Sequence, residues 1–318
     1  MVRDSTLEEL LRDCPNNWGK WGEKDEIGCL NYLDENQVLR GIKAVSKGKV
    51  FSLGVPIAHP NGDPVFPGRT QAIRINRRDR ASYVTGKVER RYGGLESADD
   101  LIIMYLHGTT HIDALGHPWY GDKIWNGYNA NETVHTVTKA SIFPIAQKGI
   151  IGRGVLIDVA RCKGKDHLSR GEEIKLEDLI TCSEKQGIKI EKRDIILIRT
   201  GWLKLFYEKG KDEFYRDFLE PGLTYRKDTV NWFKEMEIPL LGTDTLANEM
   251  TKHPETGIML PLHAALIRNL GVIFNEIVWL EDLANDCAMD NKWDFLYVAS
   301  PLKVYGGTGS PVNPLAIK

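Results

Sequence analysis

Short apolar runs alternate with amphipathic segments through the last two thirds of the chain. Continuous apolar runs are typical of strands that are buried on both faces. Segments between several of them have the apolar spacing of amphipathic helices, near residues 175–187, 224–236 and 261–270. The runs predict strands at 101–106, 155–159, 194–199, 239–243, 272–274 and 295–304. Alternating strands and helices indicate an α/β domain, and no Gly-, Pro- or Ser-rich junction divides it.

The first hundred residues are less regular. Asp34 and Gln37 have the spacing of a capping box, and apolar residues follow at helical spacing, so we expect a helix over 35–47. Residues 50–57 read as a strand, and 58–98 as a long loop or hairpin excursion with a short strand at 72–75. We therefore expect an irregular N-terminal arm over 1–33, followed by a single domain over 34–318.

Composition and charge exclude several classes of protein. The 318 residues are 42% hydrophobic and 27% charged, which is typical of a soluble globular protein. A formal net charge of −2 gives no reason to expect nucleic acid or an anionic membrane as partner, and no stretch approaches a membrane span. The basic stretch 74–80 is an exception, which we interpret as a solvated loop or a subunit contact, with an anionic-substrate site as the alternative.

The five cysteines are widely spaced and form no C-x-x-C motif. An odd number at such spacing favours free thiols in a reducing compartment over a disulfide framework. The N-terminal residues include acids where a signal peptide needs an apolar run. We therefore expect a cytoplasmic protein.

Three histidines and an aspartate lie within eleven residues, in the run His107-Gly-Thr-Thr-His111-Ile-Asp113-Ala-Leu-Gly-His117. The chain has only eight histidines in all, so this clustering is the first place to look for chemistry. Imidazole and carboxylate are common ligands of Zn²⁺, Mn²⁺ and Fe²⁺. The alternative is a set of polar residues that are satisfied by hydrogen bonds in a turn.

The spacing allows the side chains to converge. In a strand, residues 107, 111 and 113 would share one face, whereas in a helix 113 would not join the other two. The apolar run 101–106 favours a buried strand that delivers these ligands at its end. His117 follows Gly116, so a loop could return it to the same place as a fourth ligand or a free base.

This run resembles the H-x-G-T-H-x-D-x-x-x-H signature of the cyclase family of metal-dependent hydrolases, which includes bacterial kynurenine formamidase and isatin hydrolase. Gly108 and Thr109 stand where the family has x-Gly, and Leu115 stands where proline is frequent; neither change removes a ligand. The resemblance extends to residues 18–31 and 306–314, which are similar to the N-terminal arm and C-terminal loop of the longer members.

The resemblance implies a swivelling α/β fold with a mixed sheet and a metal in a deep pocket. It implies that His107, His111 and Asp113 are ligands and that His117 is a base acting on metal-bound water. Members with two ions use a downstream histidine and glutamate, for which the matches are His263 and Glu276; isatin-hydrolase-like members hold one Mn²⁺. A solvated strand end would also explain Glu276, and ordinary hydrogen bonds at a helix start would explain His263.

The expected chemistry is hydrolysis of an amide, cyclic amide or lactone, with Mn²⁺ or Zn²⁺ and no organic cofactor. His₂Asp with open positions and no thiolate suits either ion and leans mildly toward octahedral coordination. A metal lowers the pKa of bound water, and a histidine can carry the proton to the leaving group. We expect a small-molecule substrate and neither nucleic acid nor membrane as partner.

Other residues could shape the pocket. Trp119 and Tyr120 could flank an aromatic substrate or simply pack in the core. Asp244 and Glu249 could shape the pocket or bind a ligand histidine. Ser310 could contact substrate, although a turn explains its segment equally well.

An N-terminal arm that cannot bury its own tryptophans usually finds a partner surface. Trp18 and Trp21 lie in this arm and could reach a neighbouring subunit. We therefore expect a homodimer or homotetramer.

Other enzyme classes lack their signatures in this chain. No G-x-S-x-G, G-x-G-x-x-G or P-loop motif occurs. The alternatives are a lactone or dienelactone hydrolase and, in a different class, a non-catalytic protein in which the metal only stabilises structure or binds a small molecule.

Overall fold

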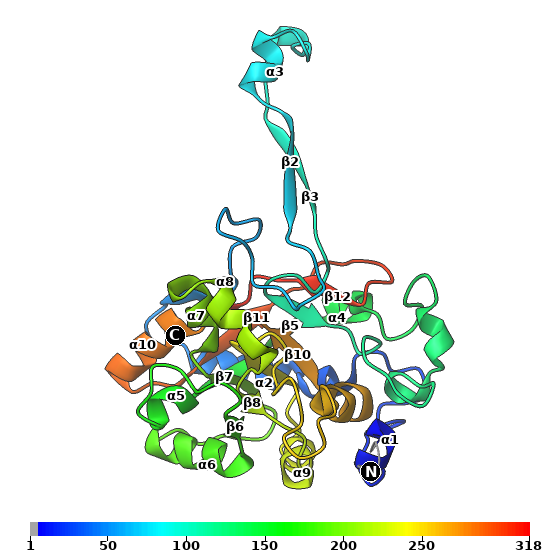
Figure 1. The fold of residues 1–318 in the computed structure, drawn as a ribbon, viewed down its shortest axis with the longest axis vertical. Helices are drawn as coiled ribbons and strands as arrows, with labels where there is room; N and C mark the ends of the chain where they lie inside the picture. Colours follow the sequence, from blue (N-terminus) through cyan, green and yellow to red (C-terminus); the bar gives the residue numbers. More distant parts are fainter. Residues whose placement is uncertain (1–5) are drawn as a thin grey trace.

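A mixed sheet of nine strands forms the centre of the computed structural model, which describes residues 6–318 (Figure 1). Strands β5, β7, β9 and β10 are parallel to one another, and the strands on both sides of this group pair antiparallel. The spatial order is β1 (Val50–Ser52), β13 (Leu315–Ile317), β11 (Asp294–Ala299), β5 (Ile150–Asp158), β7 (Ile195–Arg199), β9 (Leu240–Thr243), β10 (Ile273–Glu276), β4 (His111–Asp113) and β12 (Gly309–Pro311). The expected α/β class with a mixed sheet is confirmed.

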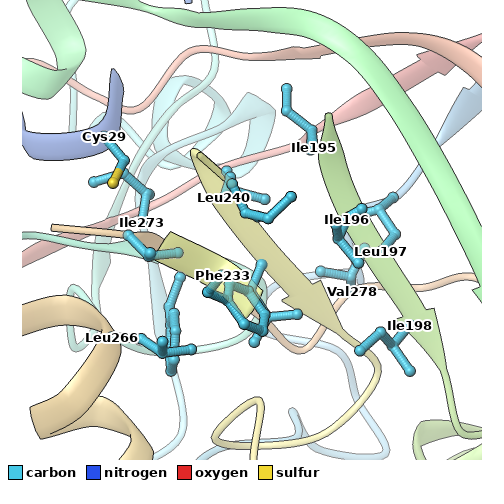
Figure 2. Packing of buried hydrophobic residues seen from close by; sticks show 14 of the residues in the cluster. Cys29, Ile195, Ile196, Leu197, Ile198, Phe233, Leu240, Leu266, Ile273 and Val278 are labelled. Carbon is cyan, nitrogen blue, oxygen red and sulfur yellow. The ribbon is translucent and has the colours of Figure 1, made fainter. Parts of the chain in front are cut away.

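The central strands are buried because their side chains are apolar on both faces. Figure 2 shows residues 195–198 of β7 beside Leu240 of β9, with Phe233 and Leu266 packed against them from two helices. All of these side chains are at most 1% exposed. This close-packed core is the rigid base on which the neighbouring strands β10 and β4 are held.

Short helices connect and cover the strands. The α-helices of the body are α1 (Leu7–Leu10), α2 (Glu35–Lys43), α4 (Ile142–Lys148), α5 (Val159–Cys162), α6 (Leu176–Lys185), α7 (Trp202–Glu208), α8 (Lys211–Tyr215), α9 (Lys227–Glu235) and α10 (Glu281–Asp290). The remaining helical turns are η1 (Gly28–Tyr32), η3 (Trp125–Gly127), η4 (Ala130–Thr133), η5 (Arg216–Phe218) and the π-helix η6 (His263–Leu270). A small parallel pair joins β6 (Glu173–Ile174) to β8 (Gly222–Leu223).

Helix α2 begins as the sequence predicts. The Asp34 side chain accepts a hydrogen bond from the Gln37 backbone N–H at 3.1 Å, which satisfies one free donor of the first turn. The helix ends at Lys43, four residues earlier than expected. Gly41 lets it approach the sheet closely, since a Cβ there would lie 2.7 Å from the Gly152 backbone of β5.

The strands expected near 155–159, 194–199, 239–243 and 272–274 are confirmed as β5, β7, β9 and β10. Two expected strands are shorter than predicted: the one at 50–57 ends at Ser52, and the one at 295–304 ends at Ala299. The helices near 175–187, 224–236 and 261–270 are confirmed as α6, α9 and η6.

The expected buried strand at 101–106 is wrong. Its first residues belong to β3 (Asp99–Ile103), which pairs only with β2 (Ile73–Arg78) in a separate two-stranded ribbon. This ribbon stands away from the body and carries α3 (Arg80–Val84) and η2 (Tyr92–Gly94) at its tip (Figure 1). The expectation of a hairpin excursion within 58–98 is confirmed, but the excursion extends to residue 103 and contains the apolar run.

The N-terminal tryptophans pack against their own chain. Trp18 donates its indole N–H to the Arg268 carbonyl at 2.9 Å, and the Arg268 guanidinium lies over its ring. Trp21 meets Tyr32 edge-on, with 5.0 Å between ring centroids. No helix within residues 6–318 is long and apolar enough to cross a membrane.

The cysteines also differ from expectation. Cys162 and Cys182 form a disulfide between α5 and α6, with their Cα atoms 5.7 Å apart, so the expectation of free thiols is wrong for this pair. Cys14, Cys29 and Cys287 are free, and burial raises the pKa of all three thiols. The two cysteines are 20 positions apart in the sequence, and the packing of α5 on α6 brings them together.

Reduction of this disulfide should lower the free energy of unfolding by about 3 kcal/mol, because the bridge closes a loop that is otherwise free in the unfolded chain. Urea unfolding with and without dithiothreitol measures this difference. The Cys162→Ser/Cys182→Ser variant is the control, and its urea midpoint should be the same with and without dithiothreitol. Equal midpoints for oxidised and reduced wild type would contradict the bridge.

Candidate metal centre

Two neighbouring antiparallel strands present the centre of the site. His111 and Asp113 flank Ile112 in β4, so their side chains share one face of the sheet. Glu276 ends β10 and is paired across the ladder with His111, which brings it to the same face. All three are at most 3% exposed. Asn275 supports the pairing of β10 with β4, because its side-chain amide donates to the His111 carbonyl at 2.8 Å.

His107 reaches the site from the turn before β4. Thr109 in this turn has a φ of 57°, which is unusual for a β-branched residue and reverses the chain. The His107 Nδ1 lies 2.7 Å from Asp113 Oδ1, and its Nε2 lies 2.9 Å from the Thr308 hydroxyl. Gly309 makes room for the ring, since a Cβ there would lie 2.7 Å from His107 Cε1.

His117 lies beside His107, with 4.1 Å between their ring centroids. The loop after β4 therefore returns this histidine to the cluster, as the sequence suggests. Unlike the other members it is only partly buried. Within residues 6–318 no side-chain hydrogen bond holds its ring nitrogens, so they are available to a further group.

His263 enters from the start of η6 and is held by Glu249. The imidazole Nδ1 lies 2.6 Å from Glu249 Oε1, and the backbone N–H groups of Leu262 and His263 also donate to this carboxylate. The other ring nitrogen, Nε2, lies 3.2 Å from Glu276 Oε1 and 3.9 Å from Asp113 Oδ2. Glu249 therefore directs Nε2 of His263 toward the two carboxylates.

Hydrogen bonding also sets the direction of His111. Its Nδ1 donates to the Thr109 carbonyl at 2.8 Å, which leaves Nε2 facing Glu276 Oε2 at 3.1 Å and Asp113 Oδ1 at 3.4 Å. That Nε2 atom is buried and makes no hydrogen bond, and the same is true of Asp113 Oδ2 and Glu276 Oε1. Three buried polar atoms without partners in one cluster are costly unless a cation satisfies them.

The pKa shifts within the cluster also favour a bound cation. Burial lowers the pKa of His111 and His263, but contacts with carboxylates outweigh this effect and raise the two values to about 9 and about 10. Burial raises the pKa of Asp113, but His117, His107 and His111 reverse this effect and hold it well below its usual range. The environment therefore favours positive charge between ionised carboxylates.

Two overlapping donor groups have the geometry to hold a metal ion. His107, Asp113 and His117 form one, and His111, Asp113 and Glu276 form the other. Within each group the ligand atoms lie within 4.8 Å of one another, and Asp113 belongs to both. The residues expected as ligands are thus brought together, but His107 and His111 fall in different groups.

Other residues named from the sequence lie elsewhere. Asp244 accepts hydrogen bonds from the backbone of Thr200 and Gly201 at 2.7 Å, which places it at the start of α7. Ser310 is paired with Ile112, so its side chain lies on the sheet face opposite His111 and Asp113, where it accepts from Leu302 N. The structure does not bring either side chain to the cluster.

The two aromatic residues after His117 differ from each other. Trp119 is 48% exposed. Tyr120 lies under the Arg268 guanidinium, 3.8 Å from its ring centroid, and its hydroxyl contacts Asn269. Tyr120 therefore has partners within the chain, whereas Trp119 is free to contact a bound molecule.

Sequence reasoning missed Thr308 and Gly309. Both lie in the Gly-Thr-Gly-Ser segment after the last core strand, and their contact with His107 arises only when β12 pairs with β4. Repeated glycines beside a hydroxyl residue were the available signal, but they are equally typical of a turn.

Comparisons with known proteins agree with this geometry. The model of the family Cyclase, described as “Putative cyclase”, matches residues 51–250. A crystal structure described as a novel cyclase is 37% identical, covers 96% of this chain and 100% of its own, and has a TM-score of 0.87. None of the curated protein sequences matches significantly.

Two more distant structures share the fold. Isatin hydrolase A from Labrenzia aggregata, solved with benzyl benzoate, is 21% identical, with a TM-score of 0.59 over 88% of this chain and 97% of its own. A predicted metal-dependent hydrolase from Bacillus stearothermophilus is 18% identical, with a TM-score of 0.50 over 85% of this chain and 98% of its own.

Glu249→Gln should weaken metal binding by about 10- to 100-fold, because the carboxylate that orients His263 loses its charge. Calorimetric titration of metal-free protein with Mn²⁺ and with Zn²⁺ measures the affinity. Glu255→Gln, an exposed glutamate in the same loop region, is the matched control and should bind as wild type does. Unchanged affinity in Glu249→Gln would show that His263 needs no such support.

Proposed function

The chain belongs to the Cyclase family, and from this premise we propose that it is a metal-dependent hydrolase that cleaves an amide, cyclic amide or lactone carbonyl. The observation that carries the proposal is the convergence of His111 Nε2, Asp113 Oδ2 and Glu276 Oε1, all buried and all without hydrogen bonds. An isatin hydrolase among the structures of similar fold supports a cyclic amide as substrate.

The donor set indicates which ions fit. One imidazole and two carboxylates, with His263 close by and no thiolate, suit Mn²⁺ or Zn²⁺. The second donor group, His107, Asp113 and His117, would be available to hold a second ion and shares Asp113 with the first. With a single ion, we propose that His107 keeps its present hydrogen bonds and orients Asp113.

A divalent ion at this position would supply Lewis-acid polarisation of the carbonyl and a nucleophilic water near neutral pH. Glu249 and the Thr109 carbonyl hold His263 and His111 with their Nε2 atoms toward the ion position. Burial of the cluster strengthens the attraction between these groups and charge that develops on the substrate.

We assign the proton transfer to His117. It adjoins the donor groups, is partly exposed, and has ring nitrogens that no described side chain occupies. Burial and the neighbouring His107 hold the pKa of His117 well below its usual value, so its ring is neutral near neutral pH and keeps a lone pair for a proton. It would return this proton to the leaving nitrogen or oxygen as the single bond between that atom and the carbonyl carbon breaks.

Removal of the metal should abolish hydrolysis. We expect metal-loaded protein to cleave at least one of N-formylkynurenine, isatin and simple lactones, with activity lost in EDTA and restored by Mn²⁺ or Zn²⁺. The substrate panel also separates amide from lactone hydrolysis. Full activity in protein that elemental analysis shows to be free of metal would contradict the proposal.

His117→Ala should lower kcat by about 10²- to 10⁴-fold while the protein retains its metal, because a general base contributes that much to such reactions. Steady-state kinetics and elemental analysis of the same sample measure both effects. His135→Asn is the control: this histidine is exposed and has a positive φ that asparagine tolerates. Loss of metal with the base would instead make His117 a ligand, and unchanged turnover would show that His117 is not the base.

A further inference from the structure

The loop between β1 and β2 is closed by a buried carboxylate. Asp63 is fully buried and accepts hydrogen bonds from the backbone N–H groups of Ala58, His59 and Ala72, at 3.0, 2.9 and 3.3 Å. These bonds hold the beginning and the end of the loop together. The segment 58–72 therefore has a defined shape, although it contains no helix or strand of its own.

The middle of this loop is attached to the turn that precedes β4. Val65 forms an antiparallel bridge with Gly108 in that turn. The Tyr215 hydroxyl accepts from the Val65 backbone N–H at 2.9 Å and donates to its carbonyl at 2.7 Å. Phe66 meets Phe218 edge-on, with 5.1 Å between ring centroids. The residues that follow Phe66 are thereby brought to the edge of the metal centre.

Arg69 is the charged side chain that the loop holds there. Its Nη1 donates to the His107 carbonyl at 2.9 Å, and its guanidinium lies over the Phe66 ring, 5.4 Å from the centroid. The side chain is partly buried. Burial is the main cause of the lowered pKa of His107 and of His117, and the positive charge of Arg69 lowers both values further. This cation therefore lies within electrostatic reach of both rings.

Arg69 has no anionic partner within residues 6–318. The buried arginines Arg153 and Arg199 each pair with at least two carboxylates, whereas Arg69 makes only the hydrogen bond to the His107 carbonyl. Its Nε and Nη2 keep their donors for a further group. A divalent ion would balance the charges of Asp113 and Glu276, which leaves Arg69 as a positive charge beside the site. An anion that accepts from these donors would stabilise this partly buried cation.

We propose that Arg69 is a specificity-determining residue, and that its guanidinium binds a carboxylate which the substrate carries near the carbonyl to be hydrolysed. The inference rests on the proposed hydrolase function and names the class of substrate. The planar fork of a guanidinium matches the two oxygens of a carboxylate. One arginine also balances the single charge of a carboxylate, whereas a phosphate group carries nearly twice that charge. The stacking on Phe66 and the bond to His107 hold the fork in place before substrate binds.

Formanilides that carry a carboxylate at the ortho, meta or para position test this assignment, each beside the carboxamide of nearly the same shape. The measured quantity is the ratio of kcat/KM for the carboxylate to kcat/KM for the carboxamide, in wild type, Arg69→Gln and Arg69→Lys. Arg12→Gln is the control, because Arg12 is exposed and also has no ion pair within the described residues. Circular dichroism and elemental analysis check that every variant is folded and holds its metal. Calorimetric titration with aminobenzoates and aminobenzamides makes the same comparison without turnover.

We expect wild type to prefer at least one carboxylate, and Arg69→Gln to lower the ratio for that compound by about 10- to 100-fold. Arg69→Lys should lose part of the preference, because it keeps the charge and loses the fork. Arg12→Gln should keep the wild-type ratio.

A wild type without preference, or a ratio that is the same in wild type and Arg69→Gln, would overturn the assignment. So would an equal loss on carboxylate and carboxamide, which would reduce Arg69 to a support for His107. If no formanilide is hydrolysed, the titrations decide. Aminobenzoate binding that Arg69→Gln weakens would support the carboxylate site even where the hydrolase proposal fails, and binding that ignores Arg69 would overturn it.

Discussion

Carboxylates buried without a countercharge are costly, and the organisation of this molecule around β4 and β10 depends on how that cost is met. Asp113 and Glu276 are almost completely buried on one face of the sheet, and each has an oxygen without a hydrogen bond. The raised pKa values of His111 and His263 show that the environment favours positive charge between them. A divalent cation bound here would supply this charge and satisfy the free lone pairs together, and its binding energy would also stabilise the folded chain.

The pairing of two short strands positions the side chains of this cluster. Antiparallel pairing of β4 with β10 sets His111 beside Glu276, and the strand period places Asp113 on the same face. A layer of partners then fixes each donor: the Thr109 carbonyl for His111, Glu249 for His263 and Thr308 for His107. Tyr297 extends the support, because its hydroxyl donates to Asn275, whose amide holds the His111 carbonyl. The parallel core strands beneath make this arrangement rigid, which is the condition for a preorganised site.

Much of this arrangement could be predicted from sequence, and the failures have physical causes. The density of histidines pointed to the cluster that the structure brings together, and the family resemblance pointed to His263 and Glu276, which lie beside it. The run 101–106 misled, because an apolar run predicts a buried strand, whereas residues 101–103 are exposed in a separate ribbon. Asp244 and Ser310 could not be placed, because hydrogen bonds to Thr200 and to Leu302 depend on tertiary contacts. Cys162 and Cys182 are likewise joined only through helix packing.

His111, Asp113 and Glu276 are the residues that we propose to hold a divalent cation. The most direct measurement is anomalous X-ray diffraction from crystals grown with Mn²⁺ or Zn²⁺, recorded on both sides of the metal absorption edge. We expect an anomalous peak at bonding distance from His111 Nε2, Asp113 Oδ2 and Glu276 Oε1. A map with no peak among these atoms, and with the three side chains turned apart, would contradict it.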